Sequence, residues 1–329
     1  MRLVFRRSAR CAGALALLVL AASPSQAQRR DTGFDIAGLD LSARTAALAG
    51  EAGGLAGADP TAAFSNPAFL TGETNRALAL GYVNHLSDIS AGLAVYARTI
   101  PRLGVDAAAS VRFLSYGTFE RSTAEGTADG TTFGASEAAV TLTAARTVAP
   151  RVRVGGSVHA LFATLDDASA QALVADLGAT YEMPSQRLVV GVSVNGFGTV
   201  LSSLGATADR LPLDVRLSVA KRLRYVPLTV TITGYELQSD EGAASDSSVA
   251  VRALDHLIVG GELALGRALT VRTGYSPRRG RALRGDGRLD LAGLSAGFGL
   301  VIRRFALDYA YTGWSEVGGL HQIGVRTRL

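Results

Sequence analysis

Cysteine is almost absent from this chain of 329 residues, and its one example, Cys11, lies within an N-terminal stretch that has the features of a cleavable signal. Cleavage of that stretch would leave a mature chain without cysteine. Disulfide bonds and cysteine-ligated metal sites are therefore excluded from the mature protein.

Long hydrophobic runs are absent after the same stretch. No segment of about 20 consecutive apolar residues occurs there, although hydrophobic residues make up 48% of the chain. A protein that crosses a membrane with helices is thereby excluded. Aromatic residues are scarce, at 6%, and glycine is abundant, with 38 residues. The apolar content is spread over many short segments.

Residues 1–27 are predicted to be a secretory signal. Four arginines precede an apolar core at residues 12–22, and Ser25-Gln26-Ala27 forms a cleavage site before Gln28. The core is too short to anchor the chain in a bilayer. Because the segment holds four arginines and no acid, cleavage near Ala27/Gln28 lowers the formal charge from +5 to +1. The mature chain gives no reason to expect nucleic-acid binding.

Short segments of alternating polarity fill the chain from about residue 75 to Leu329. Residues 228–233 alternate Leu, Val and Ile with Thr, which places apolar side chains on one face of a strand and threonines on the other. In a membrane barrel the apolar face points to lipid and the polar face to the lumen. Fourteen such segments occur, an even number, as expected of a bacterial single-chain barrel. They lie near 75–85, 88–99, 103–115, 133–147, 151–164, 171–182, 187–197, 212–222, 227–238, 257–266, 268–276, 291–302, 304–313 and 319–329.

The connections between these segments alternate in length. Those after even-numbered segments are short, and those after odd-numbered segments are mostly longer: 116–132, 165–170, 198–211, 239–256 and 277–290. Outer-membrane barrels have short periplasmic turns and long outer loops, so the pattern places both termini in the periplasm. A soluble β-sandwich or propeller is the competing fold. The signal, the apolar excess and the loop pattern favour the barrel.

Residues 28–74 are predicted to lie inside or beneath a barrel formed by residues 75–329. Residues 41–50 read as a short helix with Ser42 as N-cap and Gly50 as its end. Asp59-Pro60 and Asn66-Pro67 mark turns. The predicted architecture is all-β: a 14-stranded antiparallel transmembrane β-barrel with a short N-terminal helical segment.

No catalytic residue, cofactor or metal site is predicted, because the four histidines lack metal-ligand spacing and no glycine-rich loop precedes a helix. His159 lies on a polar strand face, where a lumen hydrogen-bond network is expected. Arg153, Asp308 and Arg326 face the lumen too, either as salt bridges that close it or as solvated charges. The glycine pairs at 155–156 and 260–261 mark bends or close backbone approaches.

Arginines crowd one predicted outer loop, at Arg278, Arg279, Arg281, Arg284 and Arg288. They could bind the phosphates of lipopolysaccharide or an acidic partner. Alternatively, the loop is simply solvated, with Asp286 and Asp290 as counter-charges. The second interpretation is favoured, because charge runs usually face solvent.

Two groups of residues resemble the PorV/PorQ family. The N-terminal group spans 39–50, with Ser42-Ala43-Arg44, then Asp59-Pro60 and 64–70, with Asn66-Pro67-Ala68. The C-terminal group comprises 260–262, 272–279, 291–299 and 305–310. The match is closer to the PorQ branch and covers nearly the whole mature chain. The Asn66-Pro67-Ala68 turn also occurs in the wider FadL-like superfamily of fourteen-stranded barrels.

The resemblance implies a non-enzymatic barrel in the outer membrane of a Gram-negative bacterium, in contact with lipid and lipopolysaccharide. It implies a role in type IX protein secretion, anchoring or scaffolding a surface partner in cargo attachment. PorQ-like members hold a PorZ-like surface protein, whereas PorV-like members accept secreted cargo. The alternative function is FadL-like transport of hydrophobic small molecules, which would require an apolar lumen, a wall opening and a mobile N-terminal plug.

Overall fold

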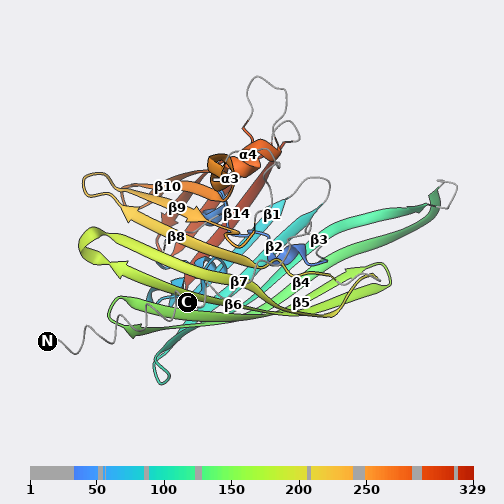
Figure 1. Ribbon diagram of the computed structural model, residues 1–329, viewed down its shortest axis with the longest axis horizontal. Coiled ribbons are helices and arrows are strands. Elements are labelled where there is room, and N and C mark those ends of the chain that lie inside the picture. The colour runs from blue at the N-terminus through green and yellow to red at the C-terminus, as the bar shows by residue number, and fades with distance from the viewer. Residues whose placement is uncertain are drawn as a thin grey trace.

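Fourteen antiparallel strands close into a barrel in the computed structural model, as the sequence predicts (Figure 1). Each strand pairs with its neighbours in sequence, and β1 closes the barrel on β14, with Ala77 opposite Arg328. The strands are β1 (Ala77–Asn84), β2 (Ser90–Ile100), β3 (Val105–Ser122), β4 (Ala128–Ala149), β5 (Val152–Leu165), β6 (Ala168–Met183), β7 (Leu188–Ser202), β8 (Asp214–Arg222), β9 (Leu228–Gly234), β10 (Leu257–Leu265), β11 (Leu269–Tyr275), β12 (Leu294–Ile302), β13 (Phe305–Gly313) and β14 (Gly319–Arg328).

The structure describes residues 33–50, 55, 57–84, 89–122, 128–205, 209–239, 249–283, 291–314 and 318–329. The predicted signal, its cleavage site, Arg284 and Arg288 lie outside these residues. Short helical pieces connect the strands or precede them. They are η1 (Asp35–Ala37), α2 (Ala43–Ala46), η2 (Pro60–Phe64), η3 (Pro67–Phe69), η4 (Gly72–Thr74), η5 (Pro184–Gln186), α3 (Val249–Asp255) and α4 (Pro277–Ala282). Among the described residues, no helix is long and apolar enough to cross a membrane.

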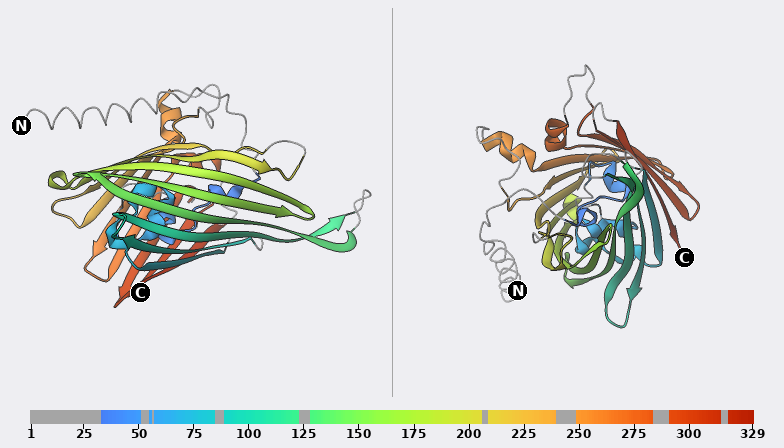
Figure 2. Two further views of the ribbon diagram at one scale, coloured as in Figure 1. Left: turned by 90° about the horizontal axis from the view of Figure 1, so that it is seen from below. Right: turned by 90° about the vertical axis from the view of Figure 1, so that its right-hand side faces the viewer.

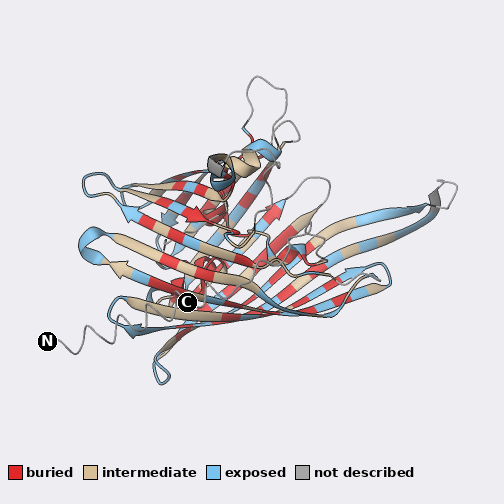
Figure 3. Cartoon of the chain, viewed as in Figure 1, coloured by how far each residue is buried: buried red, intermediate tan, exposed pale blue. Residues whose placement is uncertain are grey.

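The outer face of the barrel is apolar. On β9, Thr231 and Thr233 point inward and are buried, whereas Ile232 between them is 46% exposed. The same alternation of buried and exposed positions runs along the other strands (Figure 3). Large exposed side chains such as Leu142, Leu177 and Ile323 belong to this outer face. An apolar surface that encircles a closed barrel matches a lipid-facing band, because water-soluble proteins rarely expose one so extensive.

The interior of the barrel is occupied by described residues that precede β1, at 33–50, 55 and 57–76. The second view of Figure 2 shows this segment inside the ring of strands. We call these described residues the plug. Phe34, Ile36, Leu48, Phe69 and Leu70 are among its fully buried side chains. The core of the molecule therefore lies between the plug and the inner wall of the barrel.

Two predicted loops are wrong because strands occupy them. The predicted loop 116–132 is mostly strand, since β3 and β4 continue to pair beyond the barrel, as Phe119 opposite Phe133 shows. The predicted loop 165–170 is a turn of two residues between Leu165 and Ala168. Its first residue, Asp166, has φ 54°, a conformation that aspartate tolerates better than most residues. Polar sequence, with glycines in the first of the two segments, suggested loops at both places, and cross-strand pairing overrides that local tendency.

The predicted helix at 41–50 is shorter than expected. Only Ala43–Ala46 are helical, because Ala49 and Gly50 adopt φ of 66° and 98° and end the helix. Ser42 precedes the helix, but its side chain forms no capping hydrogen bond. The Ser42 hydroxyl instead lies 2.8 Å from the Thr61 hydroxyl, which joins two parts of the plug.

Candidate functional site

Glycines on the inner wall create the space in which the plug docks. A Cβ atom on Gly155 would lie 2.6 Å from the backbone of Pro67, and one on Gly274 would lie 2.3 Å from the backbone of Leu48. Real Cβ atoms do not approach other atoms so closely. The prediction of close backbone approach at 155–156 is therefore confirmed at Gly155.

Asn66 and Pro67 attach the plug to β6 and β7. The Asn66 side-chain amide donates to the carbonyls of Ala179 and Val192 at 3.3 and 3.0 Å, and its carbonyl oxygen accepts from the Ala68 N–H at 2.9 Å. One side chain thus caps its own turn and binds two wall strands. The Asn66-Pro67-Ala68 pattern therefore forms a turn that attaches the plug to the wall.

Wall side chains satisfy further backbone carbonyls along the plug. The Arg153 guanidinium binds the Leu70 carbonyl at 2.5 Å and the Asp106 carboxylate at 2.8 Å. Three other carbonyls of the plug accept hydrogen bonds from the wall or from α4. They are Ile36 from Arg112, Asp40 from Gln322, and Ala49 from Arg279. The plug is held from its beginning to its end.

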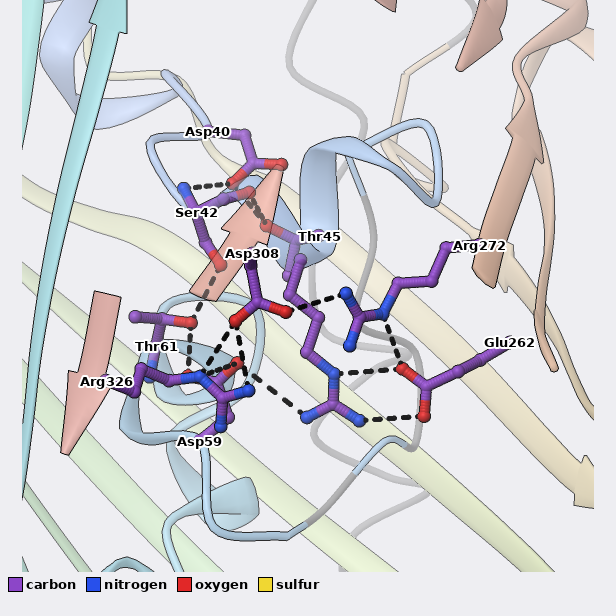
Figure 4. Close-up of polar contacts among 10 residues, drawn as sticks. Asp40, Ser42, Thr45, Asp59, Thr61, Glu262, Arg272, Asp308 and Arg326 are labelled. Atoms are coloured by element: carbon purple, nitrogen blue, oxygen red, sulfur yellow. Dashed lines mark hydrogen bonds and ion pairs between the residues drawn. The ribbon is translucent and has the colours of Figure 1, made fainter. Parts of the chain in front are cut away.

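Six charged side chains, three arginines and three acids, alternate in a closed ring between plug and wall (Figure 4). We call this set the ionic ring. Two members come from the plug, and β10, β11, β13 and β14 contribute one each. In order around the ring they are Arg44, Glu262, Arg272, Asp308, Arg326 and Asp59.

Arginines form the tight contacts of the ionic ring. Arg44 Nε lies 3.1 Å from Glu262 Oε2, and its Nη2 lies 3.2 Å from Oε1, which makes a bidentate pair. Arg272 bridges two wall acids, at 2.7 Å to Glu262 and 2.7 Å to Asp308. Bidentate geometry of this kind gives strong, directional charge-assisted hydrogen bonds. The sequence prediction of paired lumen charges is confirmed at Asp308, which also lies 3.0 Å from Arg326.

Asp59 closes the ionic ring from the plug. Its Oδ2 lies 3.7 Å from Arg44 and 3.8 Å from Arg326, while its Oδ1 accepts the Thr61 N–H and hydroxyl. Burial raises the pKa of Asp59, but the charges of Arg326 and Arg44 and the hydrogen bonds from Thr61 outweigh burial and hold the pKa below its usual value. Asp59 is therefore ionised at neutral pH, and the ring carries no net charge.

A cavity of about 520 Å³ lies on the plug, bounded on another side by α4. Plug residues that line it include Asp40, Ala49 and Phe64, and Arg279 lines it from α4. Its walls carry four arginines and four acids. They are Arg112, Arg216, Arg278, Arg279, Asp40, Asp176, Asp214 and Glu236. The lining of the cavity is therefore polar, as the alternation of polar and apolar residues predicts for the lumen.

The arginines of the predicted outer loop are distributed over three contacts. Arg278 forms an ion pair with Glu236 at 2.5 Å, and Arg281 forms one with Asp255. Arg279 turns toward the plug, where it donates to the Ala49 carbonyl at 3.3 Å. The counter-charges of Arg278 and Arg281 are thus Glu236 and Asp255 of the connection between β9 and β10. The predicted counter-charges Asp286 and Asp290 lie outside the described residues.

His159 belongs to a lumen hydrogen-bond network, as predicted. Its Nδ1 lies 2.8 Å from the Thr141 hydroxyl, and its Nε2 lies 2.7 Å from the Asp176 carboxylate. The second oxygen of Asp176 accepts the Gly196 N–H. Both ring nitrogens are occupied, so the network links β4, β5, β6 and β7 through one imidazole.

One Gly-x-Ser-x-Gly sequence occurs, at residues 293–297, a spacing found in hydrolases with a nucleophilic serine. Ser295 lies at the start of β12, opposite Thr312, in ordinary strand pairing. The hydrolase motif requires a sharp turn from a strand into a helix, which this position lacks. Among the described residues, no group of three or more His, Cys, Asp or Glu could hold a metal ion.

Substituting Gly178 by Val is expected to weaken the docking of the plug on the wall by about 3 kcal/mol. The new Cβ would lie 2.0 Å from Asn66 Oδ1, so the Asn66 hydrogen bonds could not form. Digestion of the purified barrel with trypsin should then cut the plug much faster. Gly156→Val is the matched control, because a Cβ there meets no atom closer than 3.5 Å. Equal digestion of the two variants would contradict this docking geometry.

No family model and no curated protein sequence matches this chain. Solved structures do match. The Pseudomonas putida toluene transporter TodX has a TM-score of 0.57 and 13% identity, covering 86% of this chain and 95% of TodX. A Pseudomonas aeruginosa FadL homologue has a TM-score of 0.51 and 11% identity, covering 88% of this chain and 98% of the homologue. At this identity the likeness establishes the FadL-like barrel fold.

Proposed function

We propose that this chain is an outer-membrane barrel of type IX protein secretion that anchors a surface partner in cargo attachment, without enzymatic activity. The observation that carries the proposal is the locked plug. The ionic ring and the Asn66 contacts fix the plug to the wall on several sides. A barrel with a fixed plug presents its outer surface, rather than its lumen, as the working surface.

The residues that resemble the PorV/PorQ family support this proposal. Ser42, Ala43 and Arg44 lie at α2, where Arg44 enters the ionic ring. Asn66 and Pro67 form the second attachment. The family pattern therefore coincides with the contacts that lock the plug. We infer that the partner is of the kind that the PorV/PorQ family binds, a PorZ-like surface protein or secreted cargo.

The proposed orientation places α3, α4 and the paired ends of β3 and β4, at Ser122 and Ala128, outside the cell. Connections after even-numbered strands are short, such as the step from Ala149 to Val152, whereas the connections that contain α3 and α4 are longer. Contact with lipopolysaccharide or a partner through Arg278, Arg279, Arg281 and Arg284 stays a prediction. Ion pairs with Glu236 and Asp255 already engage Arg278 and Arg281, so an anion would compete with those acids.

Deleting the gene tests the proposal in a strain that uses type IX secretion. We expect secreted cargo to lose its attachment to the cell surface, and we expect the wild-type gene to restore it. Affinity purification of the barrel from outer membranes should recover a surface protein. Normal cargo attachment in the deletion strain would refute the proposed role.

Transport of hydrophobic small molecules is the second candidate function. Two observations favour it: the cavity of about 520 Å³ and the fold shared with a protein described as a toluene transporter. The charged lining of the cavity and the fixed plug oppose it. Toluene uptake that falls in the deletion strain, with cargo attachment intact, would favour transport instead.

A further inference from the structure

The cavity on the plug contains buried polar atoms that have no hydrogen-bond partner among the described residues. Gln322 is 4% exposed, and its Oε1 is unpartnered, while its amide nitrogen donates to the Asp40 carbonyl. Arg112 is 5% exposed, and its Nε is unpartnered. The side-chain oxygens Asp40 Oδ2 and Asn195 Oδ1 are also unpartnered. All four side chains line the same cavity.

Unpartnered buried groups of this kind require partners, because an unmade hydrogen bond in a buried site costs about 1–3 kcal/mol. Three of the four atoms are acceptors and one is a donor. A ligand that satisfies them must therefore donate as well as accept. A hydroxyl group does both, since it offers one O–H donor and two acceptor lone pairs.

The space over Gly50 shows how such a group would fit. A methyl group placed on Gly50 would lie 3.6 Å from Arg279 Nη2 and 3.9 Å from Asp40 Oδ2. A guanidinium donor and a carboxyl oxygen thus flank one small volume. A hydroxyl there can accept from Arg279 and donate to Asp40.

The charge of the cavity selects against ions. Four arginines and four acids line it, so the formal charges of the lining balance. An anion would meet the carboxylates of Asp40 and Asp176, and a cation would meet Arg112 and Arg279. A hydrocarbon would remove water from all of these groups without replacing its hydrogen bonds. Trp314 and Tyr235 add aromatic surface to the lining.

We propose that this cavity binds an uncharged polyhydroxylated molecule, a sugar of one or two rings. Its volume of about 520 Å³ is within the usual range for small-ligand sites. The site lies on the plug, so the ligand is held above the closed part of the lumen. This inference is independent of the proposed secretion role.

Trp314 provides the test, because it is the single tryptophan of the chain and lines the cavity. The purified barrel in detergent is titrated with maltose, sucrose and trehalose, and with toluene and inorganic phosphate as contrasting probes. We expect a saturable change in tryptophan emission with at least one disaccharide, and matching heat by calorimetry. Toluene and phosphate should give no saturable change.

Gln322→Met and Asp40→Asn are expected to weaken sugar binding about tenfold each, since each changes one hydrogen-bonding group. Gln171→Met is the matched control, a glutamine exposed on β6 that is not part of the cavity lining. Retained β-sheet circular dichroism and heat-modifiable migration establish that each variant is folded. Asp40→Asn preserves the size of the side chain, so its effect is separate from packing.

Free sugars and the sugar ends of surface glycans share this chemistry. Titration with a purified lipopolysaccharide core oligosaccharide, beside the free disaccharides, distinguishes these two sources. A response to either supports the proposal. The proposal is overturned if no sugar produces a saturable response, even at sugar concentrations well above the millimolar range. It is also overturned if Gln322→Met and Gln171→Met bind sugar equally.

Discussion

Replacing Arg44 by Met should release the plug from the barrel wall. The substitution leaves Glu262 paired with Arg272 and Asp59 near Arg326, but two arginines then face three acids, so one negative charge of the ionic ring is uncompensated. Removing one partner from a buried ion pair costs about 3–5 kcal/mol, because the remaining charge is left uncompensated. The released plug should unblock the lumen, so purified protein in planar bilayers should conduct ions where the wild type does not.

Two companion variants show whether charge is the cause. Arg44→Met combined with Glu262→Gln restores the charge balance of the ionic ring, and we expect it to recover part of the lost stability. Arg121→Met removes an exposed pair with Asp166, whose side chains are 44% and 36% exposed. Exposed pairs contribute less than about 1 kcal/mol, so this control should keep its plug. If the Arg44→Met variant does not conduct ions, the ionic ring does not hold the plug.

The barrel could be predicted from the sequence because its signal is repeated. Period-two alternation, as at residues 228–233, is weak in one strand but is reinforced by fourteen strands and by the loop pattern. Strand ends could not be predicted in the same way. Whether β3 stops at residue 115 or runs to Ser122 depends on pairing with β4, and local composition does not report that pairing.

The plug contacts were only partly predictable. Asp308 and Arg326 stood out as charges on lumen faces, and the structure pairs them. The other partner of Arg326 is Asp59, whose position depends on how the plug enters the barrel, and no strand pattern encodes that path. Arg44 and Glu262 are separated by 218 residues, so only the fold reveals their contact. The useful sequence signals were an ionisable residue at an inward position of a strand and a glycine at the same depth.

The β3–β4 hairpin offers the second large effect. β2 pairs with β3 only as far as Ser115, and β5 pairs with β4 only as far as Ala135. Beyond these points residues 118–122 and 128–134 form a two-stranded ribbon, which projects past the other strands in Figure 1. Within the part of the chain that the structure describes, no strand pairs with either backbone edge of this ribbon, although the Gly134 carbonyl accepts the Asp166 N–H of the β5–β6 turn. Open edges accept an added strand from another protein.

Replacing residues 119–133 by Asn-Gly should abolish partner capture while leaving the barrel closed. The replacement joins Thr118 to Gly134, which are paired in the structure, and Asn-Gly favours a two-residue hairpin turn. We expect the co-purified surface protein to fall at least tenfold, because the lost segment carries backbone edges and the stacked Phe119–Phe133 pair. Quantitative mass spectrometry of affinity-purified barrels measures this.

The double variant Phe119→Ser with Phe133→Ser distinguishes the contribution of the backbone edges from that of the aromatic pair. This variant keeps the backbone edges and removes the stacked rings, whose centroids lie 5.4 Å apart. If strand addition dominates, the double variant should retain more partner than the shortened hairpin does. Unchanged partner recovery with the shortened hairpin would move the proposed contact to α3 and α4. Under the proposed role, those helices and the ribbon are the surfaces through which the barrel would hold a protein outside the cell.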